Sequence, residues 1–286
     1  MSGKRAKPSR GGKHRVAAHR RGARVRAAQR FWQLPEDELD RLLTLTGQAD
    51  RVELKLAVPA DAHRATCAAL GIDFAGATAH RVYYLDTPDR ALHRHGMVAR
   101  VRDIAHGPDD SVVKLRPVHP GDLPAGLRRS GNLVVEVDGM PGAYACAAAL
   151  KTRLGRHDVD RVMAGRRPLH TLFSQPQRRL FAAHAPAKLR IDDLTVHGPV
   201  EARRRRLRPP GTERPLLAER WTFPDGSRLL ELSTRCTPGA TLLAAADTAA
   251  VLRHHGVDLT GPQQTKTRAT LDFFTDPTHR SPGGGR

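Results

Sequence analysis

Alternation of apolar and polar residues is the main pattern along this chain. In "RVELKL", residues 51–56, three charged side chains alternate with three apolar ones. Residues two apart share one face of a β-strand, so such a segment has one charged and one apolar face. The alternation and its bounding turn residues predict strands at Asp50–Val58, Ala79–Asp86, Gly96–Asp103, Ser111–Arg116, Asn132–Asp138, Arg178–Ala183, Lys188–Asp193 and Val200–Leu207, and a hairpin about Pro224-Asp225-Gly226.

Helical patterns are fewer and shorter. A leucine stripe, an alanine-rich run and Gly stops predict helices at 35–45, 59–71, 143–155, 158–172 and 241–256. Many short strands with a few helices are typical of an antiparallel α+β fold.

The charged faces of the strands are unusual because full charges replace the mixed polar residues of an ordinary wet face. Basic residues are in excess, with a minority of carboxylates. An ordinary sheet with one solvated face is the simpler reading. A sheet curled so that these faces meet would instead form a tunnel suited to polyphosphate, whose few carboxylates could hold a divalent cation. The paired positions are Glu53 and Lys55, Arg100 and Arg102, Lys114 and Arg116, Glu136 and Asp138, and Arg190 and Asp192, with Glu231 alone.

One strand leaves this choice open. In "VEARRRRLR", Glu201, Arg203 and Arg205 share a face, but Arg204 and Arg206 charge the other face as well. The strand could line a tunnel or form an exposed basic patch.

Composition narrows the class of protein. The 286 residues contain no apolar run long enough to span a membrane, and no secretory h-region follows the N-terminal charges. The three cysteines form no C-x-x-C pair, which is typical of reduced thiols in a cytoplasmic protein.

The net charge of +19 is uneven. Residues 1–30 hold eleven Lys and Arg and no acid, which leaves about +8 for the rest. We expect residues 1–30 to be a disordered basic tail with weak, salt-sensitive attraction to nucleic acid or polyphosphate, and residues 276–286 to be a second disordered tail.

The motifs resemble those of the CYTH family, the triphosphate tunnel enzymes that include class IV adenylate cyclases, thiamine triphosphatases and inorganic triphosphatases. "YYLDTPDRALHRHGMVARVR" is similar to the family hairpin, with Asp86, Leu92 and Gly96 ahead of the two arginines. "RVELKL", "VVKLRP", "VVEVDG", "KLRIDD", "LLELSTR" and "QQTKTRATL" resemble further family strands in family order, from about residue 50 to 274.

The resemblance implies a closed antiparallel tunnel of about eight strands with flanking helices, forming a single domain over residues 31–275. It implies Mg²⁺ or Mn²⁺ and a triphosphate, nucleotide or polyphosphate ligand. The implied catalytic residues are Glu53, Lys55 and Glu231; the phosphate-binding residues are Lys55, Arg100, Arg102, Lys114, Arg116, Arg190 and Lys266; the metal ligands are Glu53, Glu136, Asp138, Asp192 and Glu231.

The chain departs from the family pattern at three places. Arg51 replaces the first glutamate of E-x-E-x-K, Ser233 replaces the second glutamate of the late pair, and Asp138 is shorter than the usual Glu. One metal remains feasible because waters and phosphate oxygens complete the shell of Mg²⁺, whereas two metals are disfavoured.

These observations favour a metal-dependent triphosphatase. A non-catalytic binding protein is the alternative, because phosphate binding is better supported than turnover. An adenylate cyclase ranks lower because nothing marks a base pocket. Nucleic-acid binding as the main function rests only on the tail and the net charge.

Overall fold

The chain folds around a closed ring of strands. A computed structural model describes residues 36–128, 132–186, 188–276 and 278. The tails predicted at 1–30 and 276–286 therefore lie outside the described residues, except for Asp276 and Thr278. The described part contains nine strands: β1 (Arg51–Val58), β2 (Thr78–Asp86), β3 (Met97–Ile104), β4 (Asp110–Leu115), β5 (Leu133–Met140), β6 (Ala143–Arg153), β7 (Thr195–Leu207), β8 (Leu216–Thr222) and β9 (Arg228–Cys236).

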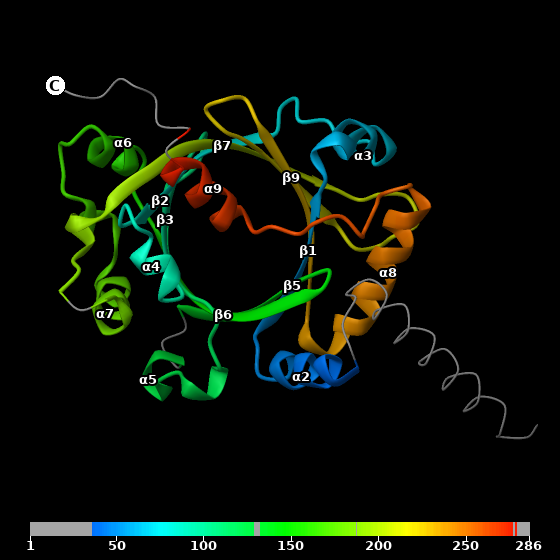
Figure 1. Cartoon of the computed structure of the whole chain (residues 1–286), viewed down its shortest axis with the longest axis horizontal. Coiled ribbons are helices and arrows are strands. Elements are labelled where there is room, and N and C mark those ends of the chain that lie inside the picture. Colours follow the sequence, from blue (N-terminus) through cyan, green and yellow to red (C-terminus); the bar gives the residue numbers. More distant parts are fainter. Residues whose placement is uncertain (1–35, 129–131, 187, 277, 279–286) are drawn as a thin grey trace, which may run out of the picture.

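The strands close in the order β1-β5-β6-β4-β3-β2-β7-β8-β9, and Figure 1 looks into the ring. The predicted tunnel and α+β class are confirmed. Two details differ from the prediction: there are nine strands in the described part of the chain, and the sheet is mixed. β1 runs parallel to β5, with Glu53 opposite Asp138, and antiparallel to β9, with Lys55 opposite Ser233. β1 closes the ring between β5 and β9. A closed ring with an odd number of strands cannot be antiparallel throughout, so one of these two contacts is parallel.

The helices surround the ring, and α9 crosses its opening (Figure 1). None of the helices in the described ranges has the length and apolar character needed to cross a lipid bilayer. The helices are α2 (Glu36–Thr46), α3 (His63–Ala69), α4 (Ala91–Arg94), α5 (Ala125–Arg128), α6 (Asp158–Met163), α7 (Gln175–His184), α8 (Thr241–His254) and α9 (Lys266–Thr275), with short 3₁₀ turns at Ala60–Ala62, Pro120–Asp122, Leu169–Leu172, Ile191–Asp193 and Pro238–Ala240.

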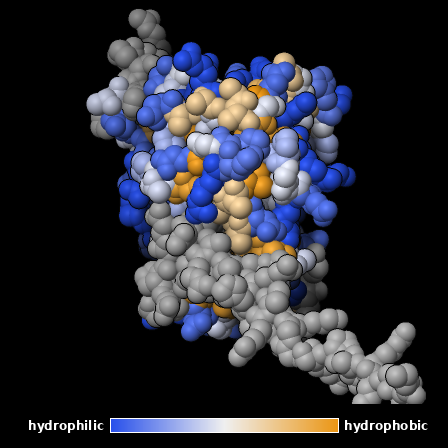
Figure 2. Space-filling view, turned by 90° about the vertical axis from the view of Figure 1, so that its right-hand side faces the viewer, coloured by the Kyte–Doolittle hydropathy of each residue, from blue (hydrophilic) through white to orange (hydrophobic). Residues whose placement is uncertain are grey.

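The main hydrophobic core lies between the outside of the ring and the helices. Val52, Leu54 and Leu56 of β1 are almost fully buried there, together with Leu42 of α2 and Leu252 of α8. Figure 2 shows the side that carries α3 and α8, where hydrophobic side chains form a narrow run among hydrophilic ones. The apolar faces of the strands therefore point outward to the helices, which leaves the charged faces for the interior.

One predicted helix is a strand. Most of residues 143–155 belongs to β6, which pairs with β5 and β4. Alanine favours helices, but pairing on both sides overrides this weak preference. Cys146, Ala148 and Leu150 pack in the outer core, while Ala149 and Lys151 line the interior. Because alanines occupy both faces, the two-residue period was hidden.

Two predicted strands are wrong as well. Residues 178–183 lie in α7, which Ser174 and Gln177 begin with a capping box that the sequence carries as S-x-x-Q. Residues 188–193 form a loop and a 3₁₀ turn. The predicted helix at 158–172 is interrupted, since only α6 and a later 3₁₀ turn are helical. The remaining predicted elements are found within a few residues of their expected bounds.

Candidate functional site: a charged tunnel

The interior of the ring is a cavity of about 350 Å³ with a highly charged wall. Among the described residues, ten basic side chains and five carboxylates line it. The basic residues are Arg51, Lys55, Arg100, Arg102, Lys114, Arg116, Lys151, Arg204, Arg235 and Lys266, and the acidic residues are Glu53, Glu136, Asp138, Glu219 and Glu231.

The β2–β3 hairpin positions Arg100 and Arg102 through a local hydrogen-bond network. Buried Asp86 accepts backbone N–H donation from Leu92 at 2.8 Å and His93 at 3.0 Å, which fixes α4 against β2. Gly96 directly precedes β3 and has a φ of +70°, and a Cβ there would lie 2.7 Å from the carbonyl oxygen of Arg116. The Asp and Gly of the hairpin motif are therefore structural, and the arginines that follow enter the tunnel.

The carboxylates occupy one side of the tunnel. All five come from β8, β9, β1 and β5, which are consecutive in the ring; we call these strands the carboxylate arc. The other strands, β6, β4, β3, β2 and β7, form the basic arc. Strands of the basic arc contribute no carboxylate to the described lining, but with the residue directly after β4 they supply six cations: Arg100, Arg102, Lys114, Arg116, Lys151 and Arg204.

Glu53, Glu136 and Asp138 form a buried cluster in which one oxygen of each lies within 4.8 Å of the others. Hard carboxylate oxygens at this spacing suit a divalent cation such as Mg²⁺ or Mn²⁺. Burial raises the pKa of Glu136, and Glu53 and Asp138 raise it further. A cation in the cluster would relieve this repulsion.

Protein cations already contact each member of this cluster. Lys55 Nζ lies 2.6 Å from Asp138 Oδ1 and 3.0 Å from Glu53 Oε2. Arg51 Nε forms an ion pair with Glu136. Burial opposes ionisation of Asp138, but Lys55, Lys114 and neighbouring Arg116 hold its pKa well below the usual range.

Arg51 and Arg235 lie beside the cluster and are partly exposed. Arg235 Nη2 is 3.1 Å from Glu53 Oε1, and its Nε is 3.8 Å from Glu136 Oε2. Arg51 thus shares the inward face with Glu53 and Lys55, as the alternation predicted. A metal ion would compete with two guanidinium groups for these oxygens.

A second ionic cluster surrounds Lys266 at the start of α9. Its Nζ pairs with Glu219 and lies 2.6 Å from Glu231 Oε1. Burial would raise the pKa of Glu219, but Lys266 and Arg204 hold it low. Burial raises the pKa of Glu231. Glu231 therefore lies with Lys266 and outside the cluster of Glu53, Glu136 and Asp138.

The basic arc has more N–H donors than the acceptors of the protein occupy. Arg102 and Lys151 both pair with Asp110, at 2.5 and 2.9 Å, and hold its pKa at about 2 against the effect of burial. Arg100 Nε is buried without a hydrogen-bond partner in the described part of the chain. Burial, Arg102 and Arg204 lower the pKa of His80 to about 4, so this imidazole is neutral at pH 7.

The placement of the predicted residues is largely as expected, with two corrections. Arg190 and Asp192 do not face the tunnel, because residues 188–193 form no strand. Arg190 is exposed and pairs with Asp193 at 2.9 Å. Asp192 instead accepts a hydrogen bond from the backbone N–H of His170 at 2.8 Å. The other predicted site residues line the cavity.

Four of the charged residues that line the described tunnel were not predicted. Glu219 and Arg235 follow from strand alternation, since they share faces with Trp221 and Ser233 in the predicted hairpin. In the arginine run of residues 203–206, the sequence left open which side chains face inward. Arg203 and Arg205 are exposed, so Arg204 faces the tunnel. Lys151 was hidden by the mistaken helix.

Comparison with solved structures supports the architecture. One similar structure is a Bacillus halodurans protein provisionally described as an adenylate cyclase, with a TM-score of 0.54 and 14% identity, covering 77% of this chain and 97% of that one. Another is a Hippeastrum protein provisionally described as an adenylyl cyclase with dominant triphosphatase activity, with a TM-score of 0.52 and 14% identity over 76% of this chain and 93% of that one.

At this level of identity the likeness establishes the fold. The tunnel fold that the family resemblance implied is therefore confirmed. No family model and no curated protein matches the sequence.

Proposed function

We propose that this protein binds triphosphate or polyphosphate compounds in its tunnel and hydrolyses them with a divalent metal. The observation that carries the proposal is the division of the tunnel wall into a basic arc and a carboxylate arc. Guanidinium groups grip phosphate oxygens through paired hydrogen bonds, so the phosphate chain would lie on the basic arc. Arg100, with its unpartnered Nε, is the first group expected to donate.

The carboxylate arc would supply the metal ligands Glu53, Glu136 and Asp138. When bound, Mg²⁺ or Mn²⁺ would offset charge on the phosphate oxygens. Lys55 and Lys114 would turn from Asp138 toward the phosphates and stabilise the charge that develops in the transition state. A water held by the carboxylates would give a proton to one of them and attack the terminal phosphorus. The bridging P–O bond would break, inorganic phosphate would form, and the shortened phosphate chain would leave while held by the basic arc.

Binding without hydrolysis is the second candidate, and Arg51 favours it. Its ion pair with Glu136 holds a cation beside an oxygen that the metal would need. Capture of a polyphosphate by the cations would then proceed while metal binding is weak. The likeness to the Hippeastrum protein concerns the fold alone, so it fits either candidate. The triphosphatase activity is described for that protein. Cyclase-like chemistry ranks third.

Phosphate release from tripolyphosphate, ATP and thiamine triphosphate, measured with Mg²⁺, with Mn²⁺ and with EDTA, tests the proposal. We expect metal-dependent release from at least one substrate, together with a rise in the melting temperature. A rise without release would favour the binding protein. If phosphate is not released and the melting temperature does not rise, both candidates are contradicted.

A further inference from the structure

Four arginines gather on the outside of the ring, away from the tunnel. We define Arg203 and Arg205 of β7, Arg220 of β8 and Arg228 of β9 as the outer arginine cluster. Arg203 lies directly opposite Arg220 in the β7–β8 pair, and Arg228 opposes a residue two positions beyond Arg220 in the β8–β9 pair. Arg203, Arg205 and Arg220 point outward because the residues that alternate with them face the tunnel. Arg228 is exposed and shares its face of β9 with Leu230, which belongs to the outer core.

The cluster keeps an excess of positive charge, although Glu201 shares its face of β7 and Asp73 acts favourably on Arg220. In the described ranges no ion pair joins these four arginines to a carboxylate, whereas exposed Arg81 pairs with two aspartates. Burial lowers the pKa of Arg220, and the charges of Arg228 and Arg203 lower it further. Like charges directly opposite each other in a sheet are destabilising, so a bound anion would remove a cost that the fold now carries.

Phe74 holds two of the arginines in place without cancelling their charge. The Cζ atom of Arg220 lies 4.6 Å from the centre of the Phe74 ring. Arg203 Nη1 donates to the backbone oxygen of Phe74 at 3.5 Å. Both guanidinium groups are thereby restrained, which lowers the entropy lost when they grip a phosphate.

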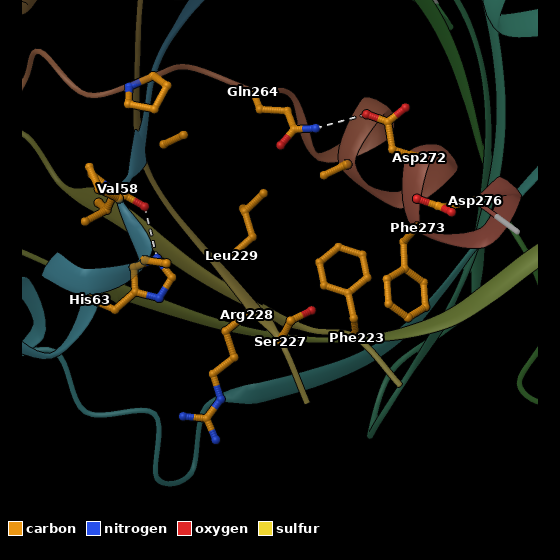
Figure 3. A pocket seen from close by; sticks show the side chains of 15 residues that line it. Val58, His63, Phe223, Ser227, Arg228, Leu229, Gln264, Asp272, Phe273 and Asp276 are labelled. Carbon is orange, nitrogen blue, oxygen red and sulfur yellow. Dashed lines mark hydrogen bonds between the residues drawn. The ribbon is translucent and has the colours of Figure 1, made fainter. Parts of the chain in front are cut away.

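A pocket of about 410 Å³ adjoins the cluster through Arg228 (Figure 3). Its middle is apolar, and Phe223 and Phe273 lie there with ring centres 5.1 Å apart. It is separate from the tunnel: Lys266 and its neighbours at the start of α9 face the tunnel, while Asp272 and Phe273 face this pocket.

The pocket has two chemically different ends. Arg228 points away from the centre at one end, while Gln264 and Asp272 lie across the apolar middle, joined by a 3.2 Å hydrogen bond (Figure 3). Asp272 also pairs with Arg90. An aromatic heterocycle could pack against Phe273 and donate an amino group to a remaining lone pair of the Asp272 carboxylate. Its phosphate would then extend past Arg228 onto the cluster.

We propose that the pocket and the outer arginine cluster form a binding site for single-stranded nucleic acid. One base enters the pocket, and the backbone crosses β9, β8 and β7. Neighbouring strands lie about 4.8 Å apart and residues two apart on a strand about 6.8 Å, so the four arginines span several phosphates. A duplex keeps its bases stacked and inorganic polyphosphate has none, so neither uses the pocket. Basic grooves with aromatic platforms bind single strands in this way.

The test uses the full chain and a fluorescent oligonucleotide, with tripolyphosphate at the lowest concentration that saturates the tunnel and identical for all variants. Arg203→Ala with Arg220→Ala should weaken binding about tenfold and reduce the slope of log K against log salt by about 1.4, for two phosphate contacts in a single strand. The matched control is Arg161→Ala with Arg167→Ala, an exposed pair already bound to Asp158. It should change affinity less than twofold, and equal losses in the two double variants would overturn the proposal.

The pocket is tested separately. Phe273→Leu keeps apolar volume but removes the aromatic face, so it should weaken oligonucleotide binding at least threefold while leaving inorganic polyphosphate binding unchanged. In the unaltered protein, ultraviolet cross-linking should attach the oligonucleotide within residues 223–229 or 269–276. Cross-links only elsewhere, or duplex binding as tight as single-strand binding, would contradict the site. None of these results depends on whether the tunnel hydrolyses triphosphates.

Discussion

The two arcs of the tunnel carry similar cations, but they differ in how these cations are paired with carboxylates. In the carboxylate arc, Lys55, Arg51 and Arg235 are each paired with carboxylates of their own arc. In the basic arc, Arg102 and Lys151 share Asp110, and Arg100 Nε lacks a hydrogen-bond partner among the described residues. Its other cations, Lys114, Arg116 and Arg204, pair with carboxylates that belong to the carboxylate arc. The carboxylate arc is therefore neutralised before a ligand arrives, whereas the basic arc keeps an excess of positive charge.

Loss of Asp138 should have the largest effect. This carboxylate is 1% exposed and contacts Lys55, Lys114 and Arg116. Breaking a buried ion pair from one side costs about 3–5 kcal/mol because the partner charge stays buried. Asp138→Asn should therefore lower the melting temperature strongly, and tripolyphosphate should restore much of the loss by taking the place of the carboxylate. A normal melting temperature would show that the carboxylate arc does not neutralise these lysines.

The double variant Arg100→Ala with Arg102→Ala should come next. A charge-assisted hydrogen bond contributes about 1.5–3 kcal/mol, so losing both arginines should weaken tripolyphosphate binding roughly 100-fold or more. Calorimetry without metal measures this directly, and most of the thermal stabilisation by the ligand should vanish. The matched control, Arg51→Ala with Arg235→Ala, removes two cations that are already paired and should cost clearly less. Equal losses would remove the distinction between the arcs.

Arg51→Glu should convert the arginine beside the metal cluster into a ligand. Its new carboxylate would join Glu136, whose pKa is already raised by burial and by neighbouring acids. We expect metal-dependent phosphate release to increase several-fold or to appear, while tripolyphosphate affinity without metal falls. Arg51→Gln separates the loss of the cation from the gain of a ligand. Unchanged activity and affinity in both variants would mean that Arg51 does not control the site.

His80 should give a smaller, pH-dependent effect. Its pKa in the free protein is about 4, lowered by burial, Arg102 and Arg204. A polyanion beside these arginines should raise that pKa, so binding takes up a proton between about pH 4 and pH 6.5. Tripolyphosphate affinity should therefore gain more on acidification through this window in the natural protein than in His80→Gln. Identical pH profiles would place the phosphates away from the basic arc near His80.

Deletion of residues 1–30 should have the smallest effect on the tunnel. Their eleven basic residues lie outside the described structure, and we predict no role for them in folding or in tripolyphosphate hydrolysis. Binding of DNA or RNA at low salt should weaken. Circular dichroism and phosphate release check the first expectation, and an unfolded truncated protein would contradict it.

The sequence predicted the charged and apolar faces of the strands because alternation is a local property, and the family resemblance implied that the charged faces meet in a tunnel. Glu53, Lys55, Arg100 and Lys114 could be assigned to one face without knowledge of their neighbours. The β6 strand could not, since Ala is compatible with either face and only pairing with β4 and β5 decides its conformation. Local alternation also misled at Arg190, where it continues without a pairing partner.

The division into two arcs could not be predicted at all. It depends on the order of strands around the ring, which brings β1 next to both β5 and β9 although they are far apart in sequence. Likewise, the link between Arg51 and Glu136 follows from the parallel β1–β5 register. Partners of that kind are fixed by topology, while each residue's face is fixed locally.

The most direct test of the central claim is a crystal structure with tripolyphosphate and Mn²⁺, using anomalous scattering from manganese to locate the metal. The division into arcs predicts phosphate oxygens within hydrogen-bonding distance of Arg100 and Arg102, and an anomalous peak at Glu53, Glu136 and Asp138. Phosphates bound outside the ring, or a manganese peak only on the basic arc, would contradict it.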